Sequence, residues 1–315
     1  MASKILISVE RLYRYYGTVC AAQDISFELA QGEVLGFLGP NGAGKTSTMR
    51  MLTGTLAPSA GRVVINGIDL LEDPRAAKAQ IGYLPETPPV YRELTVDEYL
   101  TYCARLRRVA PAQRARVIDT AKQRCGLTDV GRRLIGNLSK GFQQRVGIAQ
   151  AILHTPPVVI LDEPTVGLDP IQIRDIRTLI RELGESHGVI LSTHILPEVQ
   201  ATCNRVQIIQ RGRLVFSESI ANLEQRLTGN TLTLETATDL NHEALREIPS
   251  VTRVERLGDR RARLTFDGES PAPAVARYVV EHGWGLNELT RDRRTLEQIF
   301  VDLTCAETTP HEDAA

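Results

Sequence analysis

A glycine-rich segment near the start of the chain has the residue types that bind phosphate. Residues 39–46 read GPNGAGKT and fit the P-loop pattern GxxxxGK[ST]. Glycines let the backbone curl until several N–H groups point inward, and the positive end of a following helix extends this anion-binding surface. Lys45 would reach the β and γ phosphates, while the Thr46 hydroxyl would be an oxygen ligand for magnesium. The predicted nucleotide-binding residues here are Gly39, Asn41, Gly42, Ala43, Gly44, Lys45, Thr46 and Ser47.

Two carboxylates follow an apolar run in the middle of the chain. Residues 158–161 (VVIL) show no polar alternation, which is typical of a strand covered on both faces. The run delivers Asp162 and Glu163 to the carboxyl end of that strand, where open α/β sheets bind their ligands. Asp162 would hold magnesium, directly or through water, and Glu163 would polarise an attacking water as a general base. Without other motifs, such an Asp-Glu pair would more often belong to a solvated loop.

A third segment, residues 138–145 (LSKGFQQR), precedes Asp162 by about twenty residues. At a helix start, the Ser139 hydroxyl and the backbone around Gly141 would form a second phosphate-binding end, although an ordinary helix cap is the simpler alternative. The pattern LSxGxxQR resembles the signature motif of ABC ATPases. The resemblance implies that the nucleotide is contacted by Ser139, Lys140, Gly141, Phe142 and Gln143.

The resemblance to ABC ATPases covers residues 5–215 and includes further landmarks in the family's order. Tyr16 matches the aromatic residue that stacks on adenine, residues 167–169 (GLD) match the D-loop with Asp169, and His194 matches the switch histidine. A ring can stack on a base, and an imidazole can hydrogen-bond the γ phosphate. Without the family, Tyr16 would equally suit a core or edge-strand position, and His194 the neighbourhood of a helix cap.

One position departs from the family pattern. Residues 81–86 (IGYLPE) have Glu86 where most ABC ATPases carry the Q-loop glutamine. Either side chain offers an oxygen to magnesium, and glutamate adds a negative charge beside the metal and the triphosphate. We expect Glu86 to act as the Q-loop residue and to be a metal ligand together with Thr46 and Asp162.

Strands and helices must hold these motifs in place. Apolar, β-leaning segments lead into the P-loop, and the residues from Lys45 to Gly54 predict a helix, so the order is strand, glycine loop, helix. Such alternation is typical of α/β proteins. The segments predicted as strands are 5–9, 24–29, 34–38, 158–161 and 189–191.

A helical insertion interrupts the strand-bearing segments. Residues 92–130 are rich in Leu, Ala, Arg and Glu, with Pro111 as an internal breaker, and they predict two helices. We expect a helical subdomain at about residues 87–150. Residues 1–219 are then an α/β P-loop NTPase domain of the ABC-ATPase fold, with an antiparallel β subdomain and this helical subdomain.

The pattern changes after Ser219. A strand-like segment comes first, followed by a helical segment at 239–248 and two strand-like segments, and then by a helical, a strand-like and a last helical segment. This order predicts a small two-layer α+β domain of ferredoxin-like type. We assign it residues 220–305, with a disordered tail at 306–315. The segment 296–304 (LEQIFVDLT) resembles the LExxFxxLT close of a C-terminal domain found on ATPase subunits of export-type ABC systems.

Composition excludes several other classes. The 315 residues are 42% hydrophobic and 24% charged, with net charge -1 and an acidic second part, which does not suggest nucleic-acid binding. Five cysteines without a CxxC pair argue against zinc ribbons. No run approaches the roughly 20 apolar residues of a membrane span. We expect a cytoplasmic protein without a span of its own.

The family resemblance implies the mechanism and the partners. Two subunits, either two copies or homologues, would face head to tail, so that each ATP with its Mg²⁺ lies between one P-loop and the other subunit's signature motif. A polytopic membrane permease, of exporter type, would contact residues 83–108 and hold the protein at the inner face of the membrane. The basic run Arg105, Arg107, Arg108 is interpreted as a solvated helix face, with a lipid or permease contact as the alternative.

Three other kinds of ATPase are less compatible with the sequence. A soluble ABC ATPase acting on ribosomes usually joins two such domains through a basic linker, whereas this chain has one P-loop and one signature. A chromosome-structuring ATPase has a long coiled coil between these motifs, yet only 94 residues separate Lys45 from Ser139. An inactive nucleotide sensor would not need the full set of Lys45, Asp162, Glu163 and His194.

Overall fold

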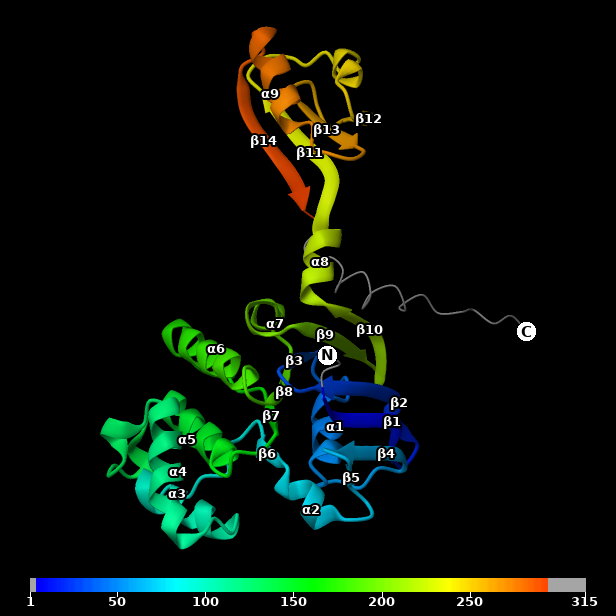
Figure 1. Ribbon diagram of the computed structural model, residues 1–315. Coiled ribbons are helices and arrows are strands. Elements are labelled where there is room, and N and C mark those ends of the chain that lie inside the picture. Colours follow the sequence, from blue (N-terminus) through cyan, green and yellow to red (C-terminus); the bar gives the residue numbers. More distant parts are fainter. Residues whose placement is uncertain (1–3, 294–315) are drawn as a thin grey trace, which may run out of the picture. The chain divides into compact units, whose positions relative to one another are not determined.

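The computed structural model describes residues 4–293. The chain divides into two compact units between Ile220 and Ala221, each with its own sheet and hydrophobic core (Figure 1). The predicted terminal helix with its 296–304 motif and the predicted disordered tail, 306–315, lie outside the described residues. Among those described, no helix combines the length and apolar character needed to cross a membrane.

The first unit is built around a six-stranded sheet with the order β10-β9-β3-β8-β7-β6. Its neighbouring strands are parallel, apart from β10, which runs antiparallel to β9. Three of the strands, β3, β7 and β8, are buried along their whole length, which explains the apolar runs without alternation. The strands are β3 (Val34–Leu38), β6 (Ile81–Leu84), β7 (Val158–Asp162), β8 (Gly188–Thr193), β9 (Arg205–Gln210) and β10 (Arg213–Ser219).

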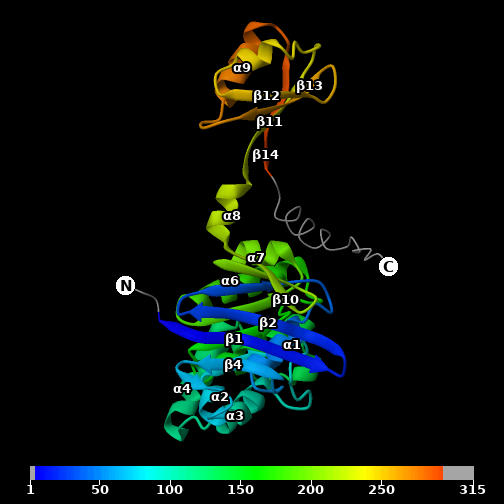
Figure 2. The same ribbon diagram turned by 90° about the vertical axis from the view of Figure 1, so that its right-hand side faces the viewer.

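A second sheet of this unit is antiparallel, with the order β2-β1-β4-β5 (Figure 2). Its first two strands extend beyond the predicted 5–9 and 24–29, because they pair as a long hairpin that turns at Gly17, where φ is +58°. Their apolar faces share one core with β3, β7 and the first helix. The elements are β1 (Ile5–Tyr16), β2 (Val19–Ala30), β4 (Ala60–Ile65), β5 (Ile68–Asp69) and the helix α2 (Pro74–Ala79).

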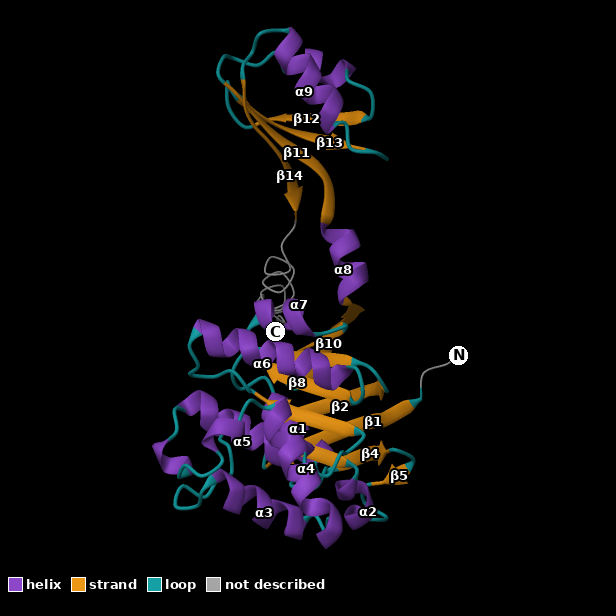
Figure 3. Ribbon diagram, turned by 60° about the vertical axis from the view of Figure 1, so that its left-hand side comes forward, coloured by secondary structure: helices purple, strands orange, loops and turns teal. Residues whose placement is uncertain are grey.

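Helices of the first unit fall into two groups (Figure 3). On the six-stranded sheet pack α1 (Lys45–Leu52), α6 (Pro170–Gly184) and α7 (Leu196–Thr202). The predicted helical subdomain contains α3 (Val96–Leu106), α4 (Pro111–Arg124) and α5 (Lys140–Ile152), which contact one another. Pro111 is the first residue of α4, where its missing N–H needs no partner, so it separates two helices rather than breaking one.

The second unit has an antiparallel sheet with the order β12-β13-β11-β14, and α9 packs beside it. This is the strand order of a ferredoxin-like βαββαβ unit. The predicted fold class is confirmed, but the predicted helix at 239–248 is reduced to a 3-10 turn, Ala244–Glu247, because the Asn241 side chain accepts from the N–H groups of Glu243 and Ala244. The elements are α8 (Ile220–Leu227), β11 (Thr228–Thr236), β12 (Val251–Arg256), β13 (Arg261–Phe266), α9 (Ala272–Glu281) and β14 (Leu286–Arg293).

Candidate active site

A cavity of about 390 Å³ opens where β3, β7 and β8 end. Parallel neighbours end at the same edge of a sheet, so the loops that follow these strands meet there. The cavity combines the predicted P-loop with the predicted Q-loop glutamate, the general base and the switch histidine. Its lining residues are Ala21, Asn41, Gly42, Gly44, Lys45, Thr46, Ser47, Glu86, Glu163, Val166 and His194.

The P-loop follows β3 and ends at Lys45, the first residue of α1. Gly42 and Gly44 have φ values of +79° and +106°, a region that L side chains rarely adopt. A Cβ at Gly44 would clash with the backbone oxygen of Ala21, and one at Gly39 with the backbone oxygen of Ile209. Glycine is therefore required at both positions by close backbone packing, which keeps the loop tightly curled.

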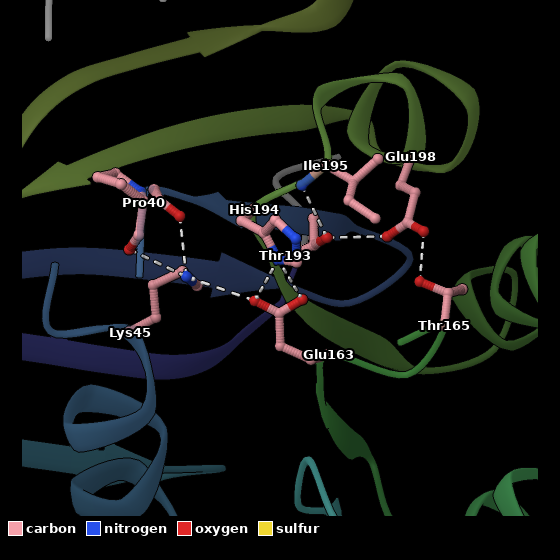
Figure 4. A network of polar contacts seen from close by, with 9 residues as sticks. Pro40, Lys45, Glu163, Thr165, Thr193, His194, Ile195 and Glu198 are labelled. Carbon is pink, nitrogen blue, oxygen red and sulfur yellow. Dashed lines mark hydrogen bonds and ion pairs between the residues drawn. The ribbon is translucent and has the colours of Figure 1, made fainter. Parts of the chain in front are cut away.

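The ammonium of Lys45 lies inside this curl and is only 5% exposed. It donates to the carbonyl oxygens of Gly39 at 2.8 Å and Pro40 at 3.2 Å, and lies 3.4 Å from a carboxylate oxygen of Glu163 (Figure 4). A buried ammonium needs several acceptors, because transfer out of water is costly for a charge. Phosphate oxygens entering the cavity could take the place of these acceptors.

Asp162, the last residue of β7, is fully buried, and neither carboxylate oxygen has a hydrogen-bond partner within normal distance among residues 4–293. Burial raises the pKa of Asp162, while the nearby hydroxyls of Ser192 and Thr46 act in the opposite direction. A buried carboxylate without a partner is destabilising unless a cation neutralises it. Together with the Thr46 hydroxyl, this oxygen set fits a hard divalent cation.

Glu163 follows directly and contacts the predicted switch histidine. Its backbone has φ of +50°, and its N–H donates to the carbonyl oxygen of Ser192 at 2.8 Å, which holds the end of β7 against β8. Nδ1 of His194 lies 2.9 and 3.1 Å from the two carboxylate oxygens (Figure 4). The Glu163 side chain is 8% exposed and that of His194 41%, so the histidine covers the carboxylate from the solvent side.

The signature segment and the D-loop lie elsewhere on the chain. Ser139 caps α5 and accepts from the N–H of Phe142 at 3.4 Å, while Asp169 caps α6 and accepts from the N–H groups of Ile171 and Gln172 at 3.0 and 2.9 Å. Gln143 donates to carbonyl oxygens of its own subdomain. The predicted residues that do not line the cavity are Tyr16, Gly39, Ala43, Ser139, Lys140, Gly141, Phe142, Gln143, Asp162 and Asp169.

Tyr16 stands at the end of β1 with its ring 44% exposed. The guanidinium of Arg14 lies 4.7 Å from the ring centroid, so one face of the ring is covered by a cation. Neither the P-loop nor Glu163 contacts this ring in the interactions above.

Sequence reasoning missed a buried polar network behind the Glu163–His194 contact. Glu198 is 1% exposed and accepts from the hydroxyls of Thr165 and Thr193, the latter at 2.8 Å (Figure 4). A glutamate in the first turn of a helix usually faces solvent, so its residue type gave no signal. The hint available in the sequence was a pair of threonines: Thr193 directly before His194, and Thr165 two residues after Glu163.

Comparison with known proteins matches both units. A family model described as ABC transporter matches residues 22–166, and one described as ATP-binding protein DrrA1-3-like, C-terminal domain, matches residues 219–304. The uncharacterized ABC transporter ATP-binding protein YxlF of Bacillus subtilis (strain 168) is 30% identical over 301 residues, which is 96% of this chain and 100% of that protein. The bacitracin transport ATP-binding protein BcrA of Bacillus licheniformis is 36% identical over 223 residues, covering 70% of this chain and 72% of BcrA.

A solved structure titled "Structure of ATP binding subunit of ABC transporter" superposes with a TM-score of 0.64 and 32% identity, covering 70% of this chain and 92% of the other. The expected ABC-ATPase fold is thereby confirmed for the first unit. The expected transporter subunit is favoured over a ribosome-associated ATPase. This chain belongs to the ATP-binding proteins of ABC transporters, which are ATPases that power transport.

Proposed function

We propose that the chain binds ATP with Mg²⁺, pairs head to tail with a second copy or a homologous subunit, and drives a separate membrane permease. One observation carries this proposal: Lys45, Glu163 and His194 meet in one cavity, whereas the helix caps made by Ser139 and Asp169 lie outside it. Each cavity thus has the groups for hydrolysis but lacks the second set of phosphate-binding groups. A facing subunit would supply them.

Within one subunit, the P-loop backbone and Lys45 would bind the β and γ phosphates, with Ser47 at the start of α1 as a further contact. The metal would be held by Thr46 and Asp162, with Glu86 from the same cavity. In the described part of the chain, no group of three or more His, Cys, Asp or Glu could hold a metal alone. That suits Mg²⁺, which is usually held by one or two carboxylates plus phosphate oxygens and neutralises phosphate charge.

Glu163 would accept the proton of the attacking water as general base. Its carboxylate is held by His194, which donates from Nδ1 when this nitrogen carries the proton. In the protonated imidazole, the opposite nitrogen also donates and could hydrogen-bond the γ phosphate. Loss of that phosphate would then release His194 and reopen the paired subunits.

The partner half of each site would come from the caps of α5 and α6. Ser139, Gly141 and the start of α5 would direct a hydroxyl, backbone N–H groups and a helix dipole toward the facing subunit's γ phosphate. Lys140, Phe142, Gln143 and Asp169 would lie at the same interface. The exposed Tyr16 would stack on adenine.

The permease would contact residues 83–108. Beside them lies a groove of about 580 Å³, lined by α2, the end of α3 and His154. Arg107 is half-buried there and donates to the carbonyl oxygen of Lys78 at 3.2 Å, so the basic run is not one uniform solvated face. The name of BcrA, a bacitracin transport ATP-binding protein, supports a role in transport. The exporter type, with the chain held at the inner face of the membrane, is inferred from the resemblance of the C-terminal segment, and the match to a DrrA-like C-terminal domain is compatible with it.

Residues 1–219 would be the motor and residues 220–305 an accessory domain, whose role would be to brace the dimer or to regulate it. The division between Ile220 and Ala221 and the family match to residues 219–304 support this assignment. We do not assign nucleic acid as a partner, because neither unit has a strongly basic composition.

A pull-down tests the proposal. Tagged Glu163→Gln protein is isolated from detergent-solubilised membranes with ATP and Mg²⁺, because slowed hydrolysis should hold the closed dimer on its partner. The matched control carries Lys45→Ala as well, which should prevent ATP from closing the dimer. Recovery of a polytopic membrane protein with Glu163→Gln would support the transporter motor. Recovery of ribosomes, or of the soluble homodimer alone, would instead favour a cytosolic ABC ATPase.

A further inference from the structure

The buried carboxylate of Glu198 joins two loops that the proposed mechanism uses. Oε1 accepts from the hydroxyl of Thr165, and Oε2 accepts from the hydroxyl of Thr193 at 2.8 Å (Figure 4). Thr165 lies two residues after Glu163, and Thr193 directly precedes His194. Glu198 itself belongs to the first turn of α7. A single side chain therefore ties both sides of the Glu163–His194 contact to one helix.

This arrangement is difficult to explain as a device for stability. The glutamate is 1% exposed, and among the side chains that the structure describes no Lys, Arg or His forms an ion pair with its carboxylate. Burying a carboxyl group without a cation is unfavourable compared with an apolar side chain of similar size. Its two hydrogen bonds to hydroxyls offset part of that cost, so the buried glutamate points to a role in geometry.

The direction of the hydrogen bonds shows what is held in place. A threonine hydroxyl has one proton. Because Thr193 donates that proton to Glu198, its oxygen faces the backbone with a free lone pair, and it accepts from the N–H of Ile195 at 3.1 Å. Residues 193–195 are thus closed into a small turn with His194 at its centre. Without the carboxylate, the hydroxyl could rotate and the turn would lose its fixed orientation.

The other hydrogen bond holds the opposite loop. Glu163 occupies a left-handed backbone conformation, with φ of +50°, which persists only where surrounding contacts impose it. Thr165 is two residues further on, and its backbone oxygen accepts from the N–H of Leu168, next to Asp169. The bond from Thr165 to Glu198 therefore fixes the segment that runs from the general base to the D-loop.

We propose that Glu198 is a positioning residue for ATP hydrolysis: it sets the Glu163 loop and the His194 loop at the separation where their side chains meet. The proposal rests on the roles given to Glu163 and His194 above. It predicts that a loss of the carboxylate, or of either hydroxyl, lowers kcat without a matching change in the KM for ATP. In Figure 4 the P-loop lysine, Lys45, contacts Glu163 and carbonyl oxygens of its own loop, and no dashed line joins it to Glu198, Thr165 or Thr193.

Paired substitutions at Thr193 separate hydrogen bonding from packing. Thr193→Val keeps the volume and loses the hydroxyl, whereas Thr193→Ser keeps the hydroxyl and loses a methyl group. We expect Thr193→Val and Glu198→Gln to lower kcat by about 10- to 100-fold, as misplaced catalytic groups do, and Thr193→Ser to retain more activity than Thr193→Val. Thr202→Val is the control, because in the described part of the chain this buried hydroxyl of the same helix bonds to the Glu198 backbone oxygen at 2.5 Å and to Cys203, and to neither threonine of the network. Loss of more activity in Thr193→Ser than in Thr193→Val would overturn the proposal.

A double-mutant cycle tests whether Glu198 acts through the histidine. Glu198→Gln is measured in the wild-type and His194→Ala backgrounds, with rates corrected for folded protein. We expect the effect of Glu198→Gln on kcat to shrink to about 3-fold or less when His194 is absent, since the positioned group is gone. Equal effects in both backgrounds would overturn the positioning role. If His194→Ala and Glu163→Gln instead retained full kcat, the roles assigned under the proposed function would fail, which is a distinguishable result.

Discussion

The two halves of the proposed nucleotide site, both carried by the first unit, are built in different ways. In the cavity set, Glu163 directly follows the buried strand β7, and Lys45 is the first residue of α1, at the end of the loop that follows β3. Both side chains are less than 10% exposed, and they pair with each other within the chain. The cap set, with Ser139 and Asp169, stands at helix starts and makes only local capping bonds to its own helices. One set is pre-organised around a cavity, and the other is presented outward.

This difference indicates which functions a single chain performs alone. The loops that follow the strands hold the cavity set in the geometry that hydrolysis would require, because neighbouring strands hold each loop in place. Helix starts need little support to present N–H groups, so they can serve a partner that arrives from outside. The cavity set should therefore govern both monomer properties and turnover, whereas the cap set should affect turnover only.

The largest effect is expected at the general base. Glu163→Gln removes the proposed acceptor of the proton of water, so kcat should fall by about 10²- to 10⁴-fold, while ATP affinity stays close to that of the wild type. Steady-state ATPase assays and equilibrium nucleotide binding measure the two quantities. Glu182→Gln, on an exposed face of α6, is the matched control. A kcat within 3-fold of wild type would remove Glu163 from the chemistry.

Alanine substitutions at two glycines, one in each set, compare the cavity set with the cap set. At Gly44 a Cβ would clash with the Ala21 backbone, so Gly44→Ala should destabilise the isolated subunit by about 2–4 kcal/mol and abolish ATP binding. At Gly141 the Cβ would meet only the end of the Gln172 side chain, so Gly141→Ala should change stability by less than about 1 kcal/mol and lower turnover alone. Denaturant unfolding and nucleotide binding to the monomer measure the contrast. Equal losses of stability in the two variants would contradict the distinction between the two sets.

Asp162 gives a pH-dependent signature. Because burial raises its pKa, the protonated form stabilises the nucleotide-free fold at low pH, and this contribution is lost as the pH rises through the raised pKa. Asp162→Asn should therefore stabilise the nucleotide-free protein by about 1 kcal/mol near pH 7 and abolish Mg²⁺-dependent turnover. The stability gap to the wild type, measured by denaturant unfolding, should grow from pH 4 to pH 7. A gap that shrinks over this range would contradict the assignment.

The smallest effect is expected at Glu86, because glutamine keeps an oxygen for the metal. Glu86→Gln should alter the Mg²⁺ concentration for half-maximal ATPase activity by about 3-fold, whereas Glu86→Ala should lower transport and turnover further. Mg²⁺ titrations of ATPase activity distinguish the two. If both substitutions were silent, Glu86 would not act as the Q-loop residue.

The features predicted best from the sequence are those in which a local structure requires particular residue types. GPNGAGKT requires its glycines for close backbone approach, and the VVILDE run requires a buried strand, so both motifs were placed correctly on β3–α1 and β7. The α+β order of the second unit followed from alternating segments in the same way. The helix at 239–248 failed because the Asn241 side chain competes for backbone N–H groups, which helical periodicity does not reveal.

Contacts between distant segments could not be derived from residue types. The approach of His194 to Glu163 was suggested only by the family resemblance, since a lone histidine after a strand has many uses. Glu198 was missed because a glutamate in a first helical turn is normally solvated, whereas here α7 packs against α6, β3 and β8 and its Glu198 is buried. The separation of the P-loop from the signature segment was likewise suggested only by the family resemblance.

The most direct test of a shared site is complementation between two inactive variants. Lys45→Ala disables the cavity set of one subunit, and Ser139→Arg blocks the cap set of the other. In a head-to-tail dimer of the two, one site is doubly damaged while the other combines an intact P-loop with an intact signature. Equal mixing should then restore ATPase activity to about a quarter of wild type for random pairing. Activity that stays at the mean of the two variants would contradict the account, because each chain would then contain its whole site.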